Sequence, residues 1–309
     1  LEVHHPSCRP ALFLCALRPA MSRRRILHPV PGERLPRGFA QRLENPPEPV
    51  EPRPAATVVL LRSGPGPAAG GDPVGHPEAA GLQVLLLRRS RATGFVPGAW
   101  VFPGGRIDAG DHALARRLGR PDEAPHLAAL REAFEETGIL LTREGGTPRI
   151  LVADRDRELD GERRSLLEGE LTMEDILGRR GLEPDPAAVT RIAHWITPEV
   201  EPRRYDTHFF AAAVPPGTRA AVDDGEIVEH RWLAPAPALA EHEAGHLPMV
   251  LPTVRTLVHL GHFRSPGDVL EYHEEREVVP ILPRFVRTPD GVALEVEEPL
   301  PGDEQEPGA

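Results

Sequence analysis

Three glutamates near the middle of the chain have the type and spacing of metal ligands. Glu132, Glu135 and Glu136 stand at positions i, i+3 and i+4, and on a helix that spacing places their carboxylates on one face. Acidic groups held this close repel one another unless a cation neutralises them, and oxygen ligands suit Mg²⁺ or Mn²⁺. The segment therefore predicts a divalent metal site, which favours chemistry on phosphate groups.

The neighbouring residues predict the helix that such a site needs. Leu127, Leu130 and Phe134 recur at i, i+3 and i+7 and form an apolar stripe roughly opposite the glutamates. Gly138 follows as a C-terminal cap, so we expect a helix over 125–137. A solvated acidic face on an amphipathic helix would have the same pattern, and the flanking sequence has to decide between the two interpretations.

The flanking sequence resembles the signature of the Nudix hydrolases, which is Gly, five residues, Glu, seven residues and then Arg-Glu-aliphatic-x-Glu-Glu-x-Gly. Residues 102–105 read Phe-Pro-Gly-Gly, and residues 131–138 read Arg-Glu-Ala-Phe-Glu-Glu-Thr-Gly. Asp111 stands where the first Glu is expected, and 19 residues separate it from Arg131. We interpret residues 112–125 as a loop inserted between Gly104-Gly105, here called the glycine turn, and the helix expected over 125–137, here called the catalytic helix.

The resemblance covers about residues 55–303 and points to the branch of the family that contains coenzyme A diphosphatases. Further similar segments lie at 94–101, 195–198, 203–210 and 280–282. Members of that branch also carry Asp at the position of Asp111 and an insertion inside the signature. The resemblance implies an α/β fold, the Nudix α/β/α sandwich with a mixed sheet, here with a helical insertion and extended termini.

Roles for individual residues follow from this resemblance. It implies that the carbonyl of Gly104 and the three glutamates hold metal, and that Arg131 orients one of the glutamates. Glu226 lies six residues before Trp232, as a further acidic ligand or general base does in relatives, and Glu229 is the competing choice. The general base stays unassigned. The catalytic set is therefore Arg131, Glu132, Glu135, Glu136 and Glu226, and the metal set is Gly104, Glu132, Glu135, Glu136 and Glu226.

Substrate contacts are expected from arginine, because the chain contains no lysine and a cationic phosphate contact must come from Arg, His or metal. Arg88 and Arg89 flank the approach to the signature, and Arg203 and Arg204 follow a Trp-Ile-Thr-Pro segment. Arg offers bidentate contacts to phosphate. Solvated surface arginines are the alternative interpretation for each of the four.

Composition limits the classes of protein that fit. The chain has 309 residues, 40% hydrophobic and 27% charged, which is ordinary for a soluble globular protein. Its net charge of −11 argues against general nucleic-acid binding. No run reaches the roughly 18 apolar residues that a membrane span needs. Cys8 and Cys15 are the only cysteines, which excludes a disulfide scaffold. We expect a cytoplasmic protein with no membrane or nucleic-acid partner; a homodimer is compatible with the sequence, which does not fix the oligomeric state.

The chain divides into three parts. Residues 1–54 predict a weakly ordered Pro- and Arg-rich arm, in which Met21 reads as a translation start that would leave 1–20 untranslated. Residues 55–298 predict the Nudix domain, with insertions at 112–125 and 154–190, the latter a helical insertion or a lid over the sheet. Residues 299–309 predict a loose acidic tail. Strands are expected at 56–62, 82–87, 99–102, 193–196, 207–214 and 227–233, and further helices at 235–243 and 253–260.

The function predicted is a Nudix hydrolase, dependent on Mg²⁺ or Mn²⁺, that cleaves the diphosphate linkage of a small nucleotide derivative. Coenzyme A or acyl-CoA is the leading substrate, which would give 3′,5′-ADP and a phosphopantetheine. ADP-ribose, NADH and dinucleoside polyphosphates are alternatives, and a non-catalytic nucleotide-binding module is another. A zinc-protease pattern, His-Glu-x-x-His, stands at 242–246, although Gly245 weakens the helix that it needs.

Overall fold

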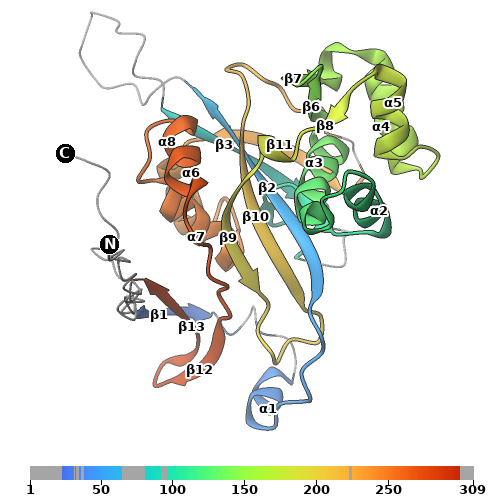
Figure 1. Cartoon of the computed structure of the whole chain (residues 1–309). Coiled ribbons are helices and arrows are strands. Elements are labelled where there is room, and N and C mark those ends of the chain that lie inside the picture. Colours follow the sequence, from blue (N-terminus) through green and yellow to red (C-terminus); the bar gives the residue numbers. More distant parts are fainter. Residues whose placement is uncertain are drawn as a thin grey trace, which may run out of the picture.

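The computed structural model of the chain has three layers, with helices on both faces of a mixed sheet (Figure 1). It describes residues 23–30, 32, 35, 38–64, 81–91, 96–222 and 225–299. The seven-stranded sheet has the order β11-β3-β2-β10-β9, with β4 beside β3 and β5 beside β2. Its strands are β2 (Arg53–Ser63), β3 (Leu82–Arg89), β4 (Trp100–Val101), β5 (Gly104–Arg106), β9 (Thr190–Ile196), β10 (Tyr205–Ala213) and β11 (Ile227–Leu233).

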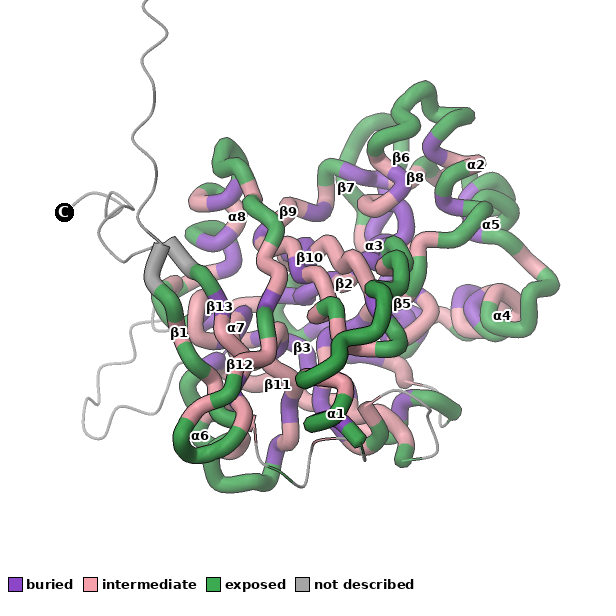
Figure 2. Tube along the Cα trace, turned by 90° about the horizontal axis from the view of Figure 1, so that it is seen from below, coloured by how far each residue is buried: buried purple, intermediate pink, exposed green. Residues whose placement is uncertain are grey.

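The central strands are apolar on both faces because both faces are covered. In β2, Val58 and Leu60 pack toward one helical layer, while Val59 and Leu61 pack toward the other. One layer contains α2 (Ala109–Arg117) and α3 (Ala124–Thr137), and the other contains α6 (Pro235–Glu243), α7 (Leu251–Leu260) and α8 (Pro266–Glu274). Figure 2 shows the buried residues concentrated along the inner strands and α3. The strands and helices expected for this part of the chain are confirmed.

The segment predicted as an inserted loop is helical instead. Residues 109–117 form α2 and Pro121–Glu123 form one turn of 3-10 helix. Asp108 and Asp111 make a reciprocal capping box at the start of α2, each carboxylate accepting the other's backbone N–H at 2.9 Å. This cap fixes the helix directly after the glycine turn. The loop prediction is wrong because Asp111, besides its place in the signature, caps a helix.

The second insertion is helical as expected, but it does not lie over the sheet. α4 (Arg157–Leu167) and α5 (Met173–Arg180) pack beside a small sheet of β6 (Ile139–Glu144), β7 (Thr147–Val152) and β8 (Glu183–Pro184). Figure 1 shows this unit next to the end of α3, and Phe134, Leu140 and Ile176 share its apolar core. Thr172 and Asp175 cap α5 reciprocally. The α4–α5 unit therefore supports α3 rather than covering the sheet.

The N-terminal segment predicted to be weakly ordered contains regular structure. β1 (Arg23–Val30) pairs antiparallel with β13 (Gly291–Pro299), which pairs with β12 (Arg284–Thr288). Phe39 of α1 (Phe39–Glu44) packs against the Phe285 ring at 4.6 Å between centroids. A strand whose partner is so distant in the chain has no local signal. Residues 1–22 and 300–309 lie outside the described residues.

None of the helices in the described ranges is both long enough and apolar enough to span a bilayer.

Gly138 is the residue that ends α3, and it gives the first prediction. Its φ is +68°, and an added Cβ would lie 2.9 Å from the Cβ of Ala153 and 3.1 Å from that of Ala221. We expect Gly138→Ala to lower the free energy of unfolding by about 2 kcal/mol, because a left-handed conformation and a crowded site both oppose a side chain.

Gly178 provides the matched control. It lies inside α5 with no atom within 4 Å of an added Cβ, so Gly178→Ala should be neutral or stabilise the protein by up to about 1 kcal/mol. Urea unfolding of both variants measures the difference, and equal effects would contradict the assignment of Gly138.

Candidate active site

Two adjacent glycines let the backbone of β5 approach α3 closely. A Cβ on Gly105 would lie 2.4 Å from Oε1 of Glu132, and a Cβ on Gly104 would lie 2.6 Å from the carbonyl oxygen of Ala56. The N–H of Gly104 donates to Oε2 of Glu136 at 3.1 Å. A side chain at Gly104 would meet the backbone of β2, and one at Gly105 would displace the carboxylate of Glu132. The glycine turn and the signature glutamates (Glu132, Glu135 and Glu136) are thus brought together, as the sequence predicted.

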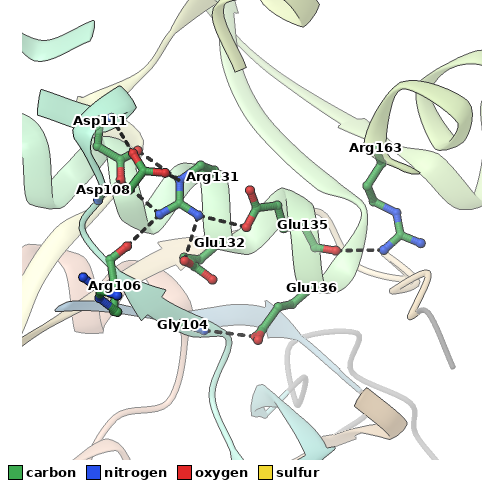
Figure 3. A network of polar contacts seen from close by, with 9 residues as sticks. All are labelled: Gly104, Arg106, Asp108, Asp111, Arg131, Glu132, Glu135, Glu136 and Arg163. Carbon is green, nitrogen blue, oxygen red and sulfur yellow. Dashed lines mark hydrogen bonds and ion pairs between the residues drawn. The ribbon is translucent and has the colours of Figure 1, made fainter. Parts of the chain in front are cut away.

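Arg131 is the centre of the polar network in Figure 3. Its Nη1 donates to Oε1 of Glu132 at 2.8 Å and to Oε2 of Glu135 at 2.9 Å. Its Nε and Nη2 donate to the two oxygens of Asp111 at 3.1 and 3.0 Å. Nη2 also donates to the carbonyl of Arg106 at 2.8 Å. The guanidinium therefore orients two of the signature glutamates, and Asp111, despite its departure from the signature, orients the guanidinium.

Burial disfavours negative charge on the signature glutamates. It raises the pKa of Glu132 to about 7, and it raises the pKa of Glu135. The pKa of Glu136 is raised well above its ordinary value by burial and by the charge of Glu132. The Arg131 cation opposes this shift at Glu132 and Glu135. When a further cation such as a metal ion binds beside buried carboxylates of this kind, it stabilises their charged form strongly.

The signature glutamates suit a hard divalent cation by their chemistry, although they do not converge on one point. Glu132 and Glu135 turn toward Arg131, while Glu136 turns toward Gly104. The other oxygens of the three carboxylates take no part in these contacts. Oxygen donors of this kind fit Mg²⁺, Mn²⁺ or Ca²⁺ rather than softer ions. Whether the Gly104 carbonyl also binds metal stays a prediction.

Glu226 lies beside this site in an ion pair with Arg89. Electrostatically, Arg89 lowers the pKa of Glu136 and Glu226 raises it, so both charges act on the signature. Glu229 instead pairs with Arg88 at 3.0 Å across the two neighbouring strands. Of the two acidic candidates outside the signature, the contacts favour Glu226.

The structure separates the two arginines that follow the Trp-Ile-Thr-Pro segment. Arg204 is buried, and its guanidinium donates to the carbonyls of Thr197 at 3.0 Å and Val50 at 2.7 Å. The prediction that Arg204 binds substrate is therefore wrong, because its donors hold two chain segments together. Arg203 is exposed, and its substrate role stays a prediction, as do those of Arg88 and Arg89.

The zinc-protease pattern does not form a metal site. α6 ends at Glu243, before the second histidine, and Gly245 has a φ of +79°. Nδ1 of His242 contacts the carbonyl of Leu247 at 3.0 Å and the N–H of Met249 at 3.3 Å. The two histidines of the pattern therefore do not share a helical face.

One supporting residue could not be found from the sequence. Arg163 of α4 is buried, and its Nη1 donates to the backbone carbonyl of Glu135 at 2.8 Å. This bond satisfies a carbonyl in the last turn of α3, where partners within the helix are missing. Arg163 is one of many arginines in a charged helical segment, and no local pattern distinguishes it.

Comparison with known proteins agrees with this geometry. A family model described as the NUDT19 Nudix domain matches residues 115–260. The acyl-coenzyme A diphosphatase NUDT19 of Gallus gallus is 30% identical, and the match covers 82% of this chain and 80% of the relative. The human protein of that name is 27% identical, and the match covers 84% of this chain and 81% of the relative. A crystal structure of a Nudix hydrolase from Alicyclobacillus acidocaldarius has a TM-score of 0.56 at 28% identity, and the match covers 72% of this chain and 96% of that one.

Arg204→Ala should destabilise the protein. The change leaves two carbonyls without their donors, which we expect to lower the free energy of unfolding by about 2–4 kcal/mol. The exposed neighbour Arg203 provides the control, since Arg203→Ala should change the free energy of unfolding by less than about 0.5 kcal/mol. Urea unfolding of both variants measures this, and a stable Arg204→Ala protein would reopen a role for Arg204 in binding.

The free energy of unfolding of the protein, measured in EDTA to keep it free of metal, should fall as the pH rises from about 4.5 to about 7. The folded state holds a proton on Glu132 up to a pKa of about 7, whereas the ordinary pKa is 4.5. More protons bound in the folded state mean that stability decreases with rising pH. Urea midpoints of the wild type and Glu132→Gln, measured in EDTA across this window, test this. The wild type should lose stability relative to the variant, and parallel curves would contradict the shifted pKa.

Proposed function

The chain belongs to the Nudix hydrolases, in the branch described by the NUDT19 Nudix domain, and on that premise we propose that its substrate is coenzyme A or an acyl-CoA. As a Nudix diphosphatase it hydrolyses the anhydride between two phosphoryl groups of a nucleotide derivative, with the help of divalent metal. Water would add to one phosphorus while the bridging P–O bond breaks, which yields 3′,5′-ADP and (acyl-)phosphopantetheine.

The observation that carries this proposal is the Arg131 network described above. Asp111 holds Arg131 in a bidentate contact, and Arg131 in turn holds Glu132 and Glu135. These contacts hold carboxylates in place for a divalent ion, which hydrolysis of a diphosphate by this kind of chemistry requires. The two relatives cited above are named acyl-coenzyme A diphosphatases, and each match covers about four-fifths of both chains. These names support the choice of substrate class.

We assign the metal to the signature glutamates, together with the carbonyl of Gly104 and Glu226. Mg²⁺ and Mn²⁺ fit this set of hard oxygen donors. A bound ion of this type polarises a phosphoryl oxygen and lowers the pKa of a coordinated water. The chain's own residues prepare the site: Arg131 fixes the direction of Glu132 and Glu135, and the N–H of Gly104 fixes that of Glu136.

Arginines beside the site would bind the phosphates of the substrate. Arg88 and Arg89 lie on β3 and pair with Glu229 and Glu226, so each could exchange a carboxylate for a phosphate oxygen. Arg203 is exposed near the start of β10. Coenzyme A carries a 3′-phosphate besides its diphosphate, and several cationic contacts suit it. The homodimer and the cytoplasmic location remain predictions from the sequence.

A turnover panel tests the substrate and the mechanism together. Coenzyme A, an acyl-CoA, ADP-ribose, NADH and a dinucleoside polyphosphate are each supplied with Mg²⁺ or Mn²⁺. We expect coenzyme A or the acyl-CoA to have the highest kcat/KM. Glu136→Gln should lower kcat roughly 10³-fold, because it removes a charged ligand that supports several kcal/mol of transition-state stabilisation.

Glu274→Gln is the matched control, since Glu274 is an exposed glutamate on α8, and it should turn over like the wild type. Preference for another diphosphate would discard the coenzyme A proposal and keep the mechanism. No turnover of any compound, with nucleotide binding retained, would favour a binding module.

A further inference from the structure

A second group of ligand-type side chains lies on β9 and β10, away from the signature glutamates. His194, Asp206 and His208, here called the edge cluster, each offer one ligand atom, and these atoms all lie within 4.8 Å of one another. Within the described ranges no other trio of His, Cys, Asp or Glu meets this condition. The signature glutamates do not, because Arg131 and Gly104 hold them apart.

The strand register fixes where the edge cluster lies. His194 is opposite His208, which is opposite Ala56, which is opposite Gly105. The cluster and the glycine turn therefore share one line across the sheet, on opposite sides of β2. Side chains at 208 and 210 point to the same face of β10, and Phe210 packs in the core between the sheet and α3. The edge cluster thus lies on the face of the sheet that α3 covers.

The contacts within the edge cluster leave a buried nitrogen unsatisfied. The rings of His194 and His208 are 4.2 Å apart between centroids, and Nε2 of His194 contacts Oδ1 of Asp206. Nδ1 of His208 is buried and has no hydrogen-bond partner in the structure. An unpaired buried polar atom costs free energy, and a bound cation with its water could provide the missing partner.

Charged and titratable neighbours enclose the edge cluster from two elements. Arg191 of β9 lies over the Phe210 ring at 5.8 Å, and His126 comes from the first turn of α3. Burial, His194 and Arg191 lower the pKa of His208 to about 4. The positive charge of Arg191 disfavours binding of a metal cation beside it, and the negative charge of the Asp206 carboxylate offsets that repulsion.

We propose that His194, Asp206 and His208 form a site for one zinc-type divalent ion, with a remaining position open to water. Two imidazole nitrogens and one carboxylate oxygen match the ligands of three-residue zinc sites. Ligand bonds of about 2.0–2.2 Å place two ligand atoms no more than about 4.4 Å apart, so small side-chain rotations would close the site. Nitrogen ligands favour zinc over Mg²⁺, which distinguishes this site from the signature glutamates.

The role that fits this position is to fasten an edge strand. β9 ends the order of the seven-stranded sheet, and one ligand comes from β9 while two come from β10. An ion that binds only the folded state stabilises it as its concentration rises above Kd. The melting temperature should therefore increase with added zinc. The proposal does not depend on the diphosphatase activity, because it uses none of the catalytic residues.

Zinc binding is measured by equilibrium dialysis of the full chain in a Glu136→Gln background, which weakens metal binding at the signature glutamates. We expect one zinc per chain. Asp206→Asn and His208→Ala should each weaken the affinity at least about 100-fold, since changes even in outer-shell residues cost 10–100-fold. His262→Ala, at an exposed histidine, is the matched control and should bind like the parent.

Asp206→Asn is nearly isosteric and decides the outcome if His208→Ala does not fold. Absence of zinc binding at micromolar concentrations would overturn the proposal. So would unchanged binding in Asp206→Asn, which would place the ion elsewhere in the chain, for example at Cys8 and Cys15. Cobalt substitution separates these cases, because a thiolate charge-transfer band would reveal cysteine ligands and the edge cluster should show none.

Discussion

The position of one buried arginine determines the geometry of the catalytic helix. Arg131 shares its guanidinium among Asp111, Glu132, Glu135 and the carbonyl of Arg106. A cation surrounded in this way cannot move without leaving several buried charges unpaired, and removing one partner of a buried charge network typically costs about 3–5 kcal/mol. The guanidinium of Arg131 therefore links β5, α2 and α3 to one another.

Support for this network comes from both insertions. The first supplies α2, whose capping pair of Asp108 and Asp111 also presents the carboxylate that holds Arg131. The second supplies Arg163, which satisfies the carbonyl of Glu135 in the last turn of α3. One segment within the family's signature and one segment after it thus both support the catalytic helix in three dimensions. A relative without α2 and α4 would need other partners for the guanidinium of Arg131 and for the carbonyl of Glu135.

Local pattern was enough to predict some elements and not others. The 125–137 helix and the apolar strand at 56–62 carry their own periodicity, and both formed as α3 and β2. β1 could not be predicted because it pairs with β13 at the other end of the chain. Arg203 and Arg204 are equivalent in sequence, and only burial shows that Arg204 serves the backbone. The edge cluster was missed because its members become neighbours only through the pairing of β9 with β10.

The pairing of β1 with β13 has a consequence for biosynthesis. Residues 30 and 291 bound the gap between the two strands, and at about 5–20 residues per second the ribosome needs roughly 10–50 s to cross it. During that time β1 has no strand partner, and its exposed Arg25 places charge where an unpaired edge would otherwise invite association between nascent chains. This small sheet can therefore form only after the catalytic helix has already emerged from the ribosome.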